Sequence, residues 1–195
     1  MGKVEFVGTF PGDLPELGLP EVAFAGRSNV GKSSALNCLA RHKGLARVSR
    51  TPGRTQAINL FRLDDRVVFA DLPGYGFAHV PDAVRVAWKP MIERYLGERT
   101  ALKLVVVLID VRREVAEMDG SLLYGLTESH IPSLVVATKC DKLSRQQLQR
   151  RLAELRRGYH LPDDQPIAFS SETGAGRDAV WAVIDAAAVP LTPGE

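Results

Sequence analysis

The sequence Gly26-Arg27-Ser28-Asn29-Val30-Gly31-Lys32-Ser33-Ser34 matches G-x-x-x-x-G-K-[ST], a pattern typical of a phosphate-binding loop. The apolar run at residues 22–25 precedes it and is typical of a strand. A segment with Leu36 and Leu39 on one face follows it and is typical of a helix. The match therefore has the strand-loop-helix context that the pattern requires. The alternative is a glycine-containing turn in which all the fixed positions coincide by chance.

A loop of this kind offers donors to a phosphate chain from several directions. Gly26 and Gly31 permit backbone turns that other residues would resist, so N–H groups can point inward. The N-terminus of the following helix adds partial positive charge. Lys32 adds a full charge, and the Ser33 hydroxyl is a hard oxygen ligand suited to Mg²⁺.

The composition is that of one ordinary globular domain. The chain has 195 residues and a formal net charge of only +2, so no overall field directs it to nucleic acid. We therefore expect no DNA partner. Basic side chains are nevertheless clustered at residues 41–54 and 142–157. Such clusters either contact RNA phosphates or form a solvated surface, and the sequence leaves both readings open.

The expected location is the cytoplasm. Cys38 and Cys140 have no partner spacing for a disulfide framework or a metal site, which fits free thiols in a reducing compartment. The N-terminus lacks a basic-then-apolar signal pattern, and no apolar run approaches the length of a membrane span. We expect a monomer with no membrane partner.

The order of apolar runs predicts an α/β domain at residues 20–189, with a mostly parallel six-stranded sheet and helices on both faces. The runs at residues 58–63 and 66–70 predict a hairpin, which places one antiparallel strand in that sheet. Residues 1–19 predict an irregular lead-in with one extended piece at residues 4–7, and residues 190–195 a short tail. Pro90 predicts a break in the helical stretch at residues 82–98.

Three residues outside the loop fit the chemistry of a triphosphate. Asp71 ends a predicted strand, where a carboxylate can bind a metal-coordinated water. Gly74 can offer a bare backbone N–H to a γ-phosphate. Thr55 lies in a polar loop from which its hydroxyl could close on Mg²⁺ when the γ-phosphate is present. Each of these, taken singly, could also be an ordinary turn or loop residue.

Two later stretches fit the recognition of guanine. The sequence Thr138-Lys139-Cys140-Asp141 follows a predicted strand, and Asp141 can accept hydrogen bonds from both N1–H and N2–H₂ of guanine. Ser170 and Ser171 follow the last strand and could offer backbone N–H groups to the guanine carbonyl oxygen. Lys139 and Asp141 taken singly could be a solvated surface pair. The combined order of all these stretches favours the nucleotide-binding interpretation.

The order of the motifs resembles that of the translation-factor-like GTPases. The residues within these motifs resemble those of the EngB/YsxC/YihA family of bacterial ribosome-biogenesis GTPases. This resemblance implies a P-loop GTPase fold, also called a G domain. The matching stretches lie within residues 20–185 and are residues 20–34, Pro52-Gly53-Arg54-Thr55-Gln56, Asp71-Leu72-Pro73-Gly74-Tyr75-Gly76-Phe77-Ala78, Thr138-Lys139-Cys140-Asp141-Lys142-Leu143-Ser144 and Phe169-Ser170-Ser171. The family uses Thr at position 138, where many GTPases have Asn, so this position is no departure from it.

The resemblance assigns roles to individual residues. It implies that Ser33 and Thr55 ligate Mg²⁺, with Asp71 behind a water, and that Lys32, Thr55 and Gly74 serve hydrolysis. It implies that GTP or GDP is bound by Gly26, Arg27, Ser28, Asn29, Val30, Gly31, Lys32, Ser33, Ser34, Gly53, Arg54, Thr55, Gln56, Asp71, Leu72, Pro73, Gly74, Thr138, Lys139, Cys140, Asp141, Phe169, Ser170 and Ser171.

The implied function is a GTP-binding switch that assists assembly of the large ribosomal subunit through rRNA, with a linked requirement in cell division and septation. We expect slow hydrolysis, because Tyr75 stands where many switch GTPases place a Gln that orients water. Asn29 stands where potassium-activated relatives use an Asn, which predicts stimulation by K⁺; the rival is that the ribosome completes the site. The alternatives are a P-loop phosphotransferase for a small molecule and a GTP-binding module without useful hydrolysis.

Overall fold

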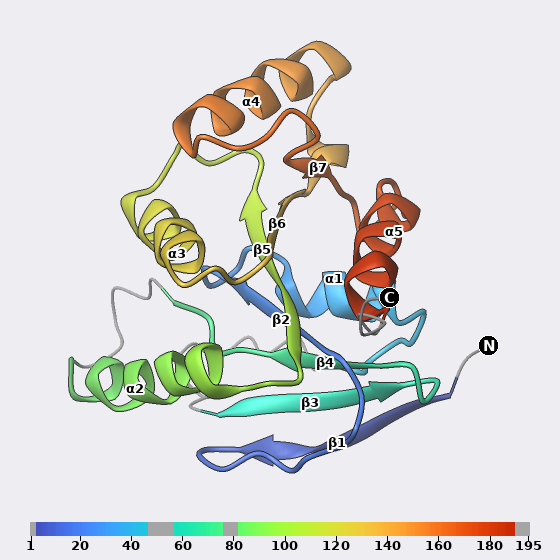
Figure 1. Ribbon diagram of the computed structural model, residues 1–195. Coiled ribbons are helices and arrows are strands. Elements are labelled where there is room, and N and C mark those ends of the chain that lie inside the picture. Colours follow the sequence, from blue (N-terminus) through green and yellow to red (C-terminus); the bar gives the residue numbers. More distant parts are fainter. Residues whose placement is uncertain (1–2, 47–56, 76–81, 190–195) are drawn as a thin grey trace, which may run out of the picture.

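The computed structural model describes residues 3–46, 57–75 and 82–189, so the expected tail at residues 190–195 lies outside it. In the described part of the chain, seven strands form one sheet in the order β1-β3-β4-β2-β5-β6-β7 (Figure 1). The strands are β1 (Val4–Phe10), β2 (Glu21–Gly26), β3 (Ile58–Leu63), β4 (Val67–Asp71), β5 (Leu102–Asp110), β6 (Ser133–Thr138) and β7 (Ile167–Ala168). The helices are α1 (Lys32–Leu39), α2 (Asp82–Glu98), α3 (Glu117–Glu128), α4 (Arg145–Gly158) and α5 (Arg177–Ala188).

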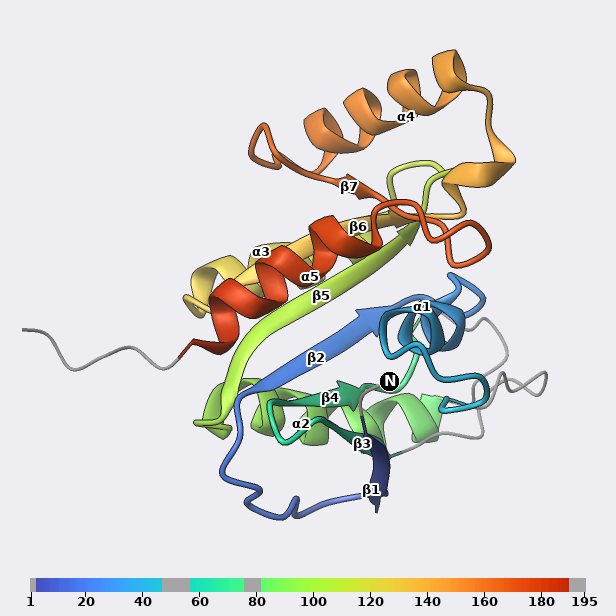
Figure 2. The same cartoon turned by 90° about the vertical axis from the view of Figure 1, so that its right-hand side faces the viewer.

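The sheet is buried on both faces. Side chains alternate along β2, so Val22 and Phe24 join the core on one face while Ala23 and Ala25 join the core on the other. Helices α1 and α5 pack on the first face, and α2, α3 and α4 pack on the second (Figures 1 and 2). The predicted α/β arrangement, with helices on both faces, is confirmed.

The predicted hairpin is formed by β3 and β4, which pair antiparallel. Asp64 and Asp65 in its turn both have φ of 51°, a left-handed conformation that suits the twist of a tight hairpin. Among the described strands, β3 runs antiparallel to both of its neighbours, β1 and β4, and the remaining pairs are parallel. One antiparallel strand in an otherwise parallel sheet is therefore confirmed.

The predicted strand number and lead-in need correction, because β1 adds a seventh strand to the expected six. Residues 4–10 are not irregular: they pair with β3 from Val4 opposite Leu63 to Phe10 opposite Ile58. Phe6 is 55% exposed, and its ring centroid lies 5.5 Å from that of Phe61. An edge strand of this kind shows weak apolar alternation in the sequence. The register shifts between Phe6 and Gly8, where the pairing is irregular.

The predicted break in α2 is also wrong. The helix runs without interruption through Pro90. Pro90 is exposed, while Met91 and Tyr95 of the same helix pack against the core, so the proline does not lie in the packed face. Among the residues that the structure describes, no helix is both long and apolar enough to cross a lipid bilayer.

The topology brings separate loops to one edge of the sheet. Strands β2, β4, β5, β6 and β7 run parallel, so their carboxyl ends lie at the same edge (Figure 2). In an open α/β sheet this edge holds the ligand crevice. The stretches that begin at Gly26, Asp71, Thr138 and Phe169 all follow these strand ends.

Candidate functional site

The phosphate loop has the backbone that its glycines predict. Gly26 ends β2, and a Cβ there would lie 2.9 Å from both the carbonyl of Leu108 and a methyl of Val30. Gly31 precedes α1 with φ of 99°, and Asn29 has φ of 64°. A side chain at Gly26 would clash, and one at Gly31 would be strained. The sequence therefore forms a tight loop whose end is the N-terminus of α1.

Lys32 joins the loop to β4. It begins α1, and its ammonium group contacts Oδ1 of Asp71, the last residue of β4. These side chains are 13% and 10% exposed, so water screens the pair only partly. The Asn59 amide of β3 donates to the other carboxylate oxygen of Asp71 at 3.4 Å. The structure thus brings the predicted phosphate ligand and the predicted metal-site carboxylate into contact.

The donor set fits a magnesium ion that is held mainly by phosphate and water. Ser33 lies in the first turn of α1 and supplies a hydroxyl, and Asp71 supplies a carboxylate. Both are the hard oxygen ligands that Mg²⁺ prefers. Within the described ranges, no group of three or more His, Cys, Asp and Glu could hold a metal alone. Thr55 lies outside the described residues, as do Gly53, Arg54 and Gln56.

The segment after β4 lies along the phosphate loop. The N–H of Tyr75 donates to the carbonyl of Gly26 at 3.4 Å, and the N–H of Ser28 donates to the carbonyl of Tyr75 at 3.1 Å. A Cβ at Gly74 would lie 3.3 Å from Oγ of Ser28, so the Gly74 backbone is close to the loop. Leu72 is buried in the core and Pro73 follows it. The structure therefore places the predicted γ-phosphate contact beside the phosphate loop.

Thr138 fastens the loop that follows β6 to the phosphate loop. Its hydroxyl is 2.7 Å from the carbonyl of Val30 and 3.1 Å from the carbonyl of Ile109. The hydroxyl can donate to either carbonyl, and Thr138 is only 3% exposed. Cys140, also buried, donates its N–H to the carbonyl of Phe169 at 3.2 Å. Residues predicted to bind the base and those predicted to bind phosphate thus share one hydrogen-bonded framework.

Lys139 crosses the phosphate loop and meets a carboxylate that the sequence analysis missed. Its ammonium donates to the carbonyl of Asn29 at 2.7 Å and to Asp110 at 2.9 Å. Asp110 ends β5 and also accepts from Arg112 at 2.8 and 2.9 Å. Burial raises the pKa of Asp110, but the hydrogen bonds from Arg112 and Lys139 outweigh it and lower the pKa. A carboxylate at a strand end, the signal used for Asp71, could have identified Asp110.

Asp141 is held in place by Ser170. The Ser170 hydroxyl donates to Oδ1 of Asp141 at 2.7 Å, and the ammonium of Lys142 lies 2.9 Å from Oδ2. These two partners lower the pKa of Asp141, so its carboxylate stays charged. Ser170 is fully buried, and its oxygen also accepts the backbone N–H groups of Glu172 and Thr173, each at 3.2 Å. The carboxylate predicted to recognise guanine is therefore oriented.

One part of the predicted guanine contact needs correction. The backbone N–H of Ser170 donates to the carbonyl of Ala175 at 3.0 Å, so it cannot also face a guanine carbonyl. Ser171 is exposed and follows directly. The predicted contact to the guanine carbonyl oxygen therefore falls to the N–H of Ser171. The Ser170 side chain instead supports Asp141.

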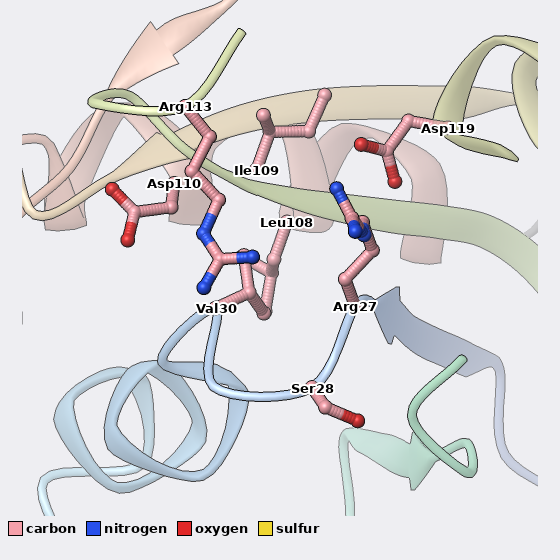
Figure 3. A pocket seen from close by; sticks show the side chains of 8 residues that line it. All are labelled: Arg27, Ser28, Val30, Leu108, Ile109, Asp110, Arg113 and Asp119. Carbon is pink, nitrogen blue, oxygen red and sulfur yellow. The ribbon is translucent and has the colours of Figure 1, made fainter. Parts of the chain in front are cut away.

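Arg27 faces away from the crevice of the phosphate loop. Its side chain points toward Asp119 of α3, while Ser28 points to the opposite side (Figure 3). Burial raises the pKa of Asp119, and a hydrogen bond from Tyr75 and the charge of Arg27 only partly counter it. Sequence spacing gives no sign of Asp119, which lies far along the chain from the loop. A small cavity on this side is lined by Arg27, Ser28, Val30, Leu108, Ile109, Asp110, Arg113 and Asp119.

Comparison with protein families gives a match over more than half of the chain. Residues 21–139 match the model described as "50S ribosome-binding GTPase". This range includes the phosphate loop, the Asp71 segment and the start of the Lys139 loop.

Curated relatives cover nearly the whole chain. A "Probable GTP-binding protein EngB" of Geobacter metallireducens is 49% identical over 187 residues, covering 95% of this chain and 92% of the relative. A protein of the same name from Syntrophus aciditrophicus is 50% identical over 179 residues, covering 91% of each chain.

Solved structures agree with the fold. The crystal structure of a probable GTP-binding protein engB superimposes with a TM-score of 0.69 and 26% identity, over 84% of this chain and 96% of that one. Era in complex with MgGDPNP and a fragment of 16S ribosomal RNA superimposes with a TM-score of 0.71. Its identity is 21%, over 90% of this chain and 59% of that one, so it supports the fold alone.

Proposed function

Because the chain belongs to the EngB family of 50S ribosome-binding GTPases, we propose that this GTP-binding protein is a nucleotide-dependent switch in assembly of the large ribosomal subunit. The observation that carries the proposal is the meeting of three loops at one sheet edge. These are the phosphate loop with Lys32, the Asp71–Gly74 segment, and the Asp141 loop supported by Ser170. The proposal includes a linked requirement in cell division and septation, either as a consequence of failed assembly or as a separate role.

We propose that each loop binds one part of the nucleotide. Lys32 and the backbone of residues 26–34 bind the β- and γ-phosphates, and Asp141 accepts the N1–H and N2–H₂ groups of guanine. Ser33 and Thr55 would hold Mg²⁺, and Asp71 would supply a carboxylate to a water bound to the ion. The ion when bound neutralises charge that develops on the phosphates. The N–H of Gly74 meets the γ-phosphate.

We propose that hydrolysis is slow without an activator. The phenol of Tyr75 donates to Asp119 and so does not serve the role of a water-orienting Gln. Asn29, exposed at the turn of the phosphate loop, is our candidate for holding a K⁺ ion near the phosphates. The rival account is that the ribosome completes the site.

Replacing Na⁺ with K⁺ is expected to raise the GTP turnover rate about tenfold, because a cation beside the phosphates stabilises charge developing in the transition state. The measurement is phosphate release in KCl and in NaCl at equal ionic strength. Asn29→Gly, which adopts φ of 64° without strain, is expected to remove the difference between the two salts. Equal turnover of the parent protein in the two salts would contradict the role of K⁺.

We propose that the outer face of α4 contacts rRNA phosphates. Arg145, Arg150 and Arg157 are exposed on this helix, and Arg150 is 82% exposed in its pair with Glu154. Arginine clusters with this exposure attract phosphates in a salt-dependent manner. Most of the other basic cluster, at residues 41–54, lies outside the described residues. The α4 face is therefore the surface on which the proposal can be tested.

Co-sedimentation with purified large ribosomal subunits tests this function. Binding is expected with a non-hydrolysable GTP analogue and not with GDP or without nucleotide. Arg145→Gln combined with Arg157→Gln is expected to weaken binding at least tenfold and to reduce the salt dependence by about one to two phosphate contacts. The matched control is Arg94→Gln with Lys103→Gln, which removes the same charge from exposed positions outside α4.

The results of co-sedimentation test the nucleotide-dependent switch and the role of α4 separately. Nucleotide-independent sedimentation would contradict the switch. Equal weakening by the control pair would contradict a specific role of α4 and leave only general electrostatic attraction. Loss of all subunit binding in every nucleotide state would leave a GTP-binding protein with another partner, and the division machinery would then be tested next.

A further inference from the structure

Tyr75 is held from two sides. Its backbone pairs with the phosphate loop through Gly26 and Ser28, at 3.4 and 3.1 Å. Its phenol hydroxyl donates to Oδ1 of Asp119 at 2.9 Å, although the two residues lie 44 positions apart. Burial and the neighbouring carboxylate raise the pKa of this phenol, so it stays protonated and donates. Tyr75 therefore ties the phosphate loop to the first turn of α3.

Asp119 is itself held in place by burial and by several polar neighbours. It is 3% exposed and lies in the first turn of α3, where the positive end of the helix favours a carboxylate. Its second oxygen accepts from the Tyr159 hydroxyl at 3.3 Å, and Tyr159 in turn accepts the N–H of Ala116 at 2.8 Å. Arg27 points toward the same carboxylate (Figure 3). A buried group in such a network moves only when several interactions change together.

Gly74 lies inside the restrained segment. On one side, the N–H of Leu72 donates to the carbonyl of Phe24 in β2 at 3.1 Å. On the other side, Tyr75 is tied to the loop and to α3. A Cβ at Gly74 would lie 3.6 Å from the carbonyl oxygen of Gly26 and 3.7 Å from Cα of Ser28, which shows how close the two backbones are. The Gly74 backbone is thus held near the phosphate loop.

We propose that Asp119 and Tyr75 are positioning residues that favour a nucleoside triphosphate over a diphosphate. Asp119 holds Tyr75, and Tyr75 holds Gly74 where its N–H meets a γ-phosphate. The inference rests on the proposed function, which assigns that contact to Gly74. GDP has no γ-phosphate and does not use the Gly74 contact, so its affinity depends much less on the tie than the affinity for GTP does. Loosening the tie therefore lowers the affinity for GTP selectively.

Tyr75→Phe tests the tie, because it removes the hydroxyl and keeps the ring and the backbone. Dissociation constants are measured for GDP and for a non-hydrolysable GTP analogue by competition with a fluorescent nucleotide. The analogue is expected to bind about three- to tenfold more weakly, while the affinity for GDP changes less than twofold. Asp119→Asn keeps an acceptor for the hydroxyl and is expected to have a smaller effect with the same selectivity.

Tyr124→Phe is the matched control, because Tyr124 lies on α3, as Asp119 does, and is 66% exposed to solvent. It is expected to change neither affinity. Thermal unfolding of each variant shows whether the fold is retained. Three results for Tyr75→Phe would overturn the inference. They are an equal loss of affinity for GDP and for the analogue, no change in either affinity, or a gain in affinity for the analogue. If the parent protein binds neither nucleotide, the proposed function itself fails, which is a different result.

Discussion

Asp141→Asn is expected to weaken binding of guanine nucleotides by a factor of about 100 or more and to transfer the preference to xanthine nucleotides. In the proposed function the carboxylate accepts two N–H groups of guanine, and each hydrogen bond to a charged group contributes about 1.5–3 kcal/mol. Asparagine supplies an oxygen and an NH₂ group in their place. The NH₂ group is matched by the second carbonyl of xanthine, which replaces the guanine amino group.

The folded structure should tolerate this change. The Ser170 hydroxyl, 2.7 Å from Oδ1 of Asp141, can still donate to the amide oxygen of asparagine. The pair with Lys142 is lost, but that side chain is 57% exposed, and an exposed pair contributes little. Any large effect on binding therefore reports base recognition and not unfolding.

The measurement is competition by GDP, XDP and ADP against a fluorescent guanine or xanthine nucleotide. Asp163→Asn is the matched control, because the Asp163 side chain is fully exposed to solvent. It is expected to leave all three affinities unchanged. An Asp141→Asn protein that still prefers guanine would show that the base is recognised elsewhere, and the assignment of the Asp141 loop would be wrong.

Lys32→Ala is expected to reduce the affinity for both GTP and GDP by about 100-fold or more, since it removes a full charge from the phosphate site. It is also expected to lower the free energy of unfolding by about 1–3 kcal/mol, because Asp71 is only 10% exposed and loses its cation. The Asn59 amide remains as a partner, which limits this loss.

The two effects can be separated with a second substitution. Lys32→Ala combined with Asp71→Asn removes the unpaired charge, so stability is expected to return toward that of the parent protein while nucleotide binding stays lost. Lys43→Ala, at an exposed position shortly after α1, is the control and is expected to change neither property. Binding is measured by calorimetry and stability by denaturant unfolding. Recovery of binding in the double variant would show that Lys32 acts only through the fold.

The parts of the site that follow directly from the sequence are those in which one short stretch contains both the residues and their context. The phosphate loop is such a stretch, because the strand before it and the helix after it can be recognised locally. The order of strands also predicts that Asp71, Asp141 and Ser170 follow strand ends on one edge. Parallel pairing then brings them together with no information beyond the chain order.

Contacts between distant segments could not be predicted in this way. The phenol of Tyr75 meets Asp119 across 44 positions, and Lys139 meets Asp110 across 29. Side-chain direction at these places depends on how α3 packs and on the turn that follows β5. The sequence predicts that Tyr75 is unsuited to orient water, and the structure adds that its hydroxyl donates to Asp119. No pattern in the sequence predicts this partner.

The edge of the sheet illustrates a second limit. The residues of β1 are partly buried or exposed with no regular alternation, and this pattern is too weak to separate a strand from a loop. Pro90 shows the opposite case, in which a strong local signal is overridden. The helix continues through Pro90, which lies at an exposed position, with the loss of one backbone hydrogen bond.

The irregular pairing between Phe6 and Gly8 bears on how the protein behaves at high concentration. An outermost strand offers unpaired N–H and C=O groups, and a second copy could add its own strand there to begin a continuous ribbon of chains. An irregular register with charged neighbours interrupts the regular spacing that such growth needs, and Lys3 and Glu5 lie close to it. The irregular pairing therefore protects the outer edge of the sheet against the addition of further chains.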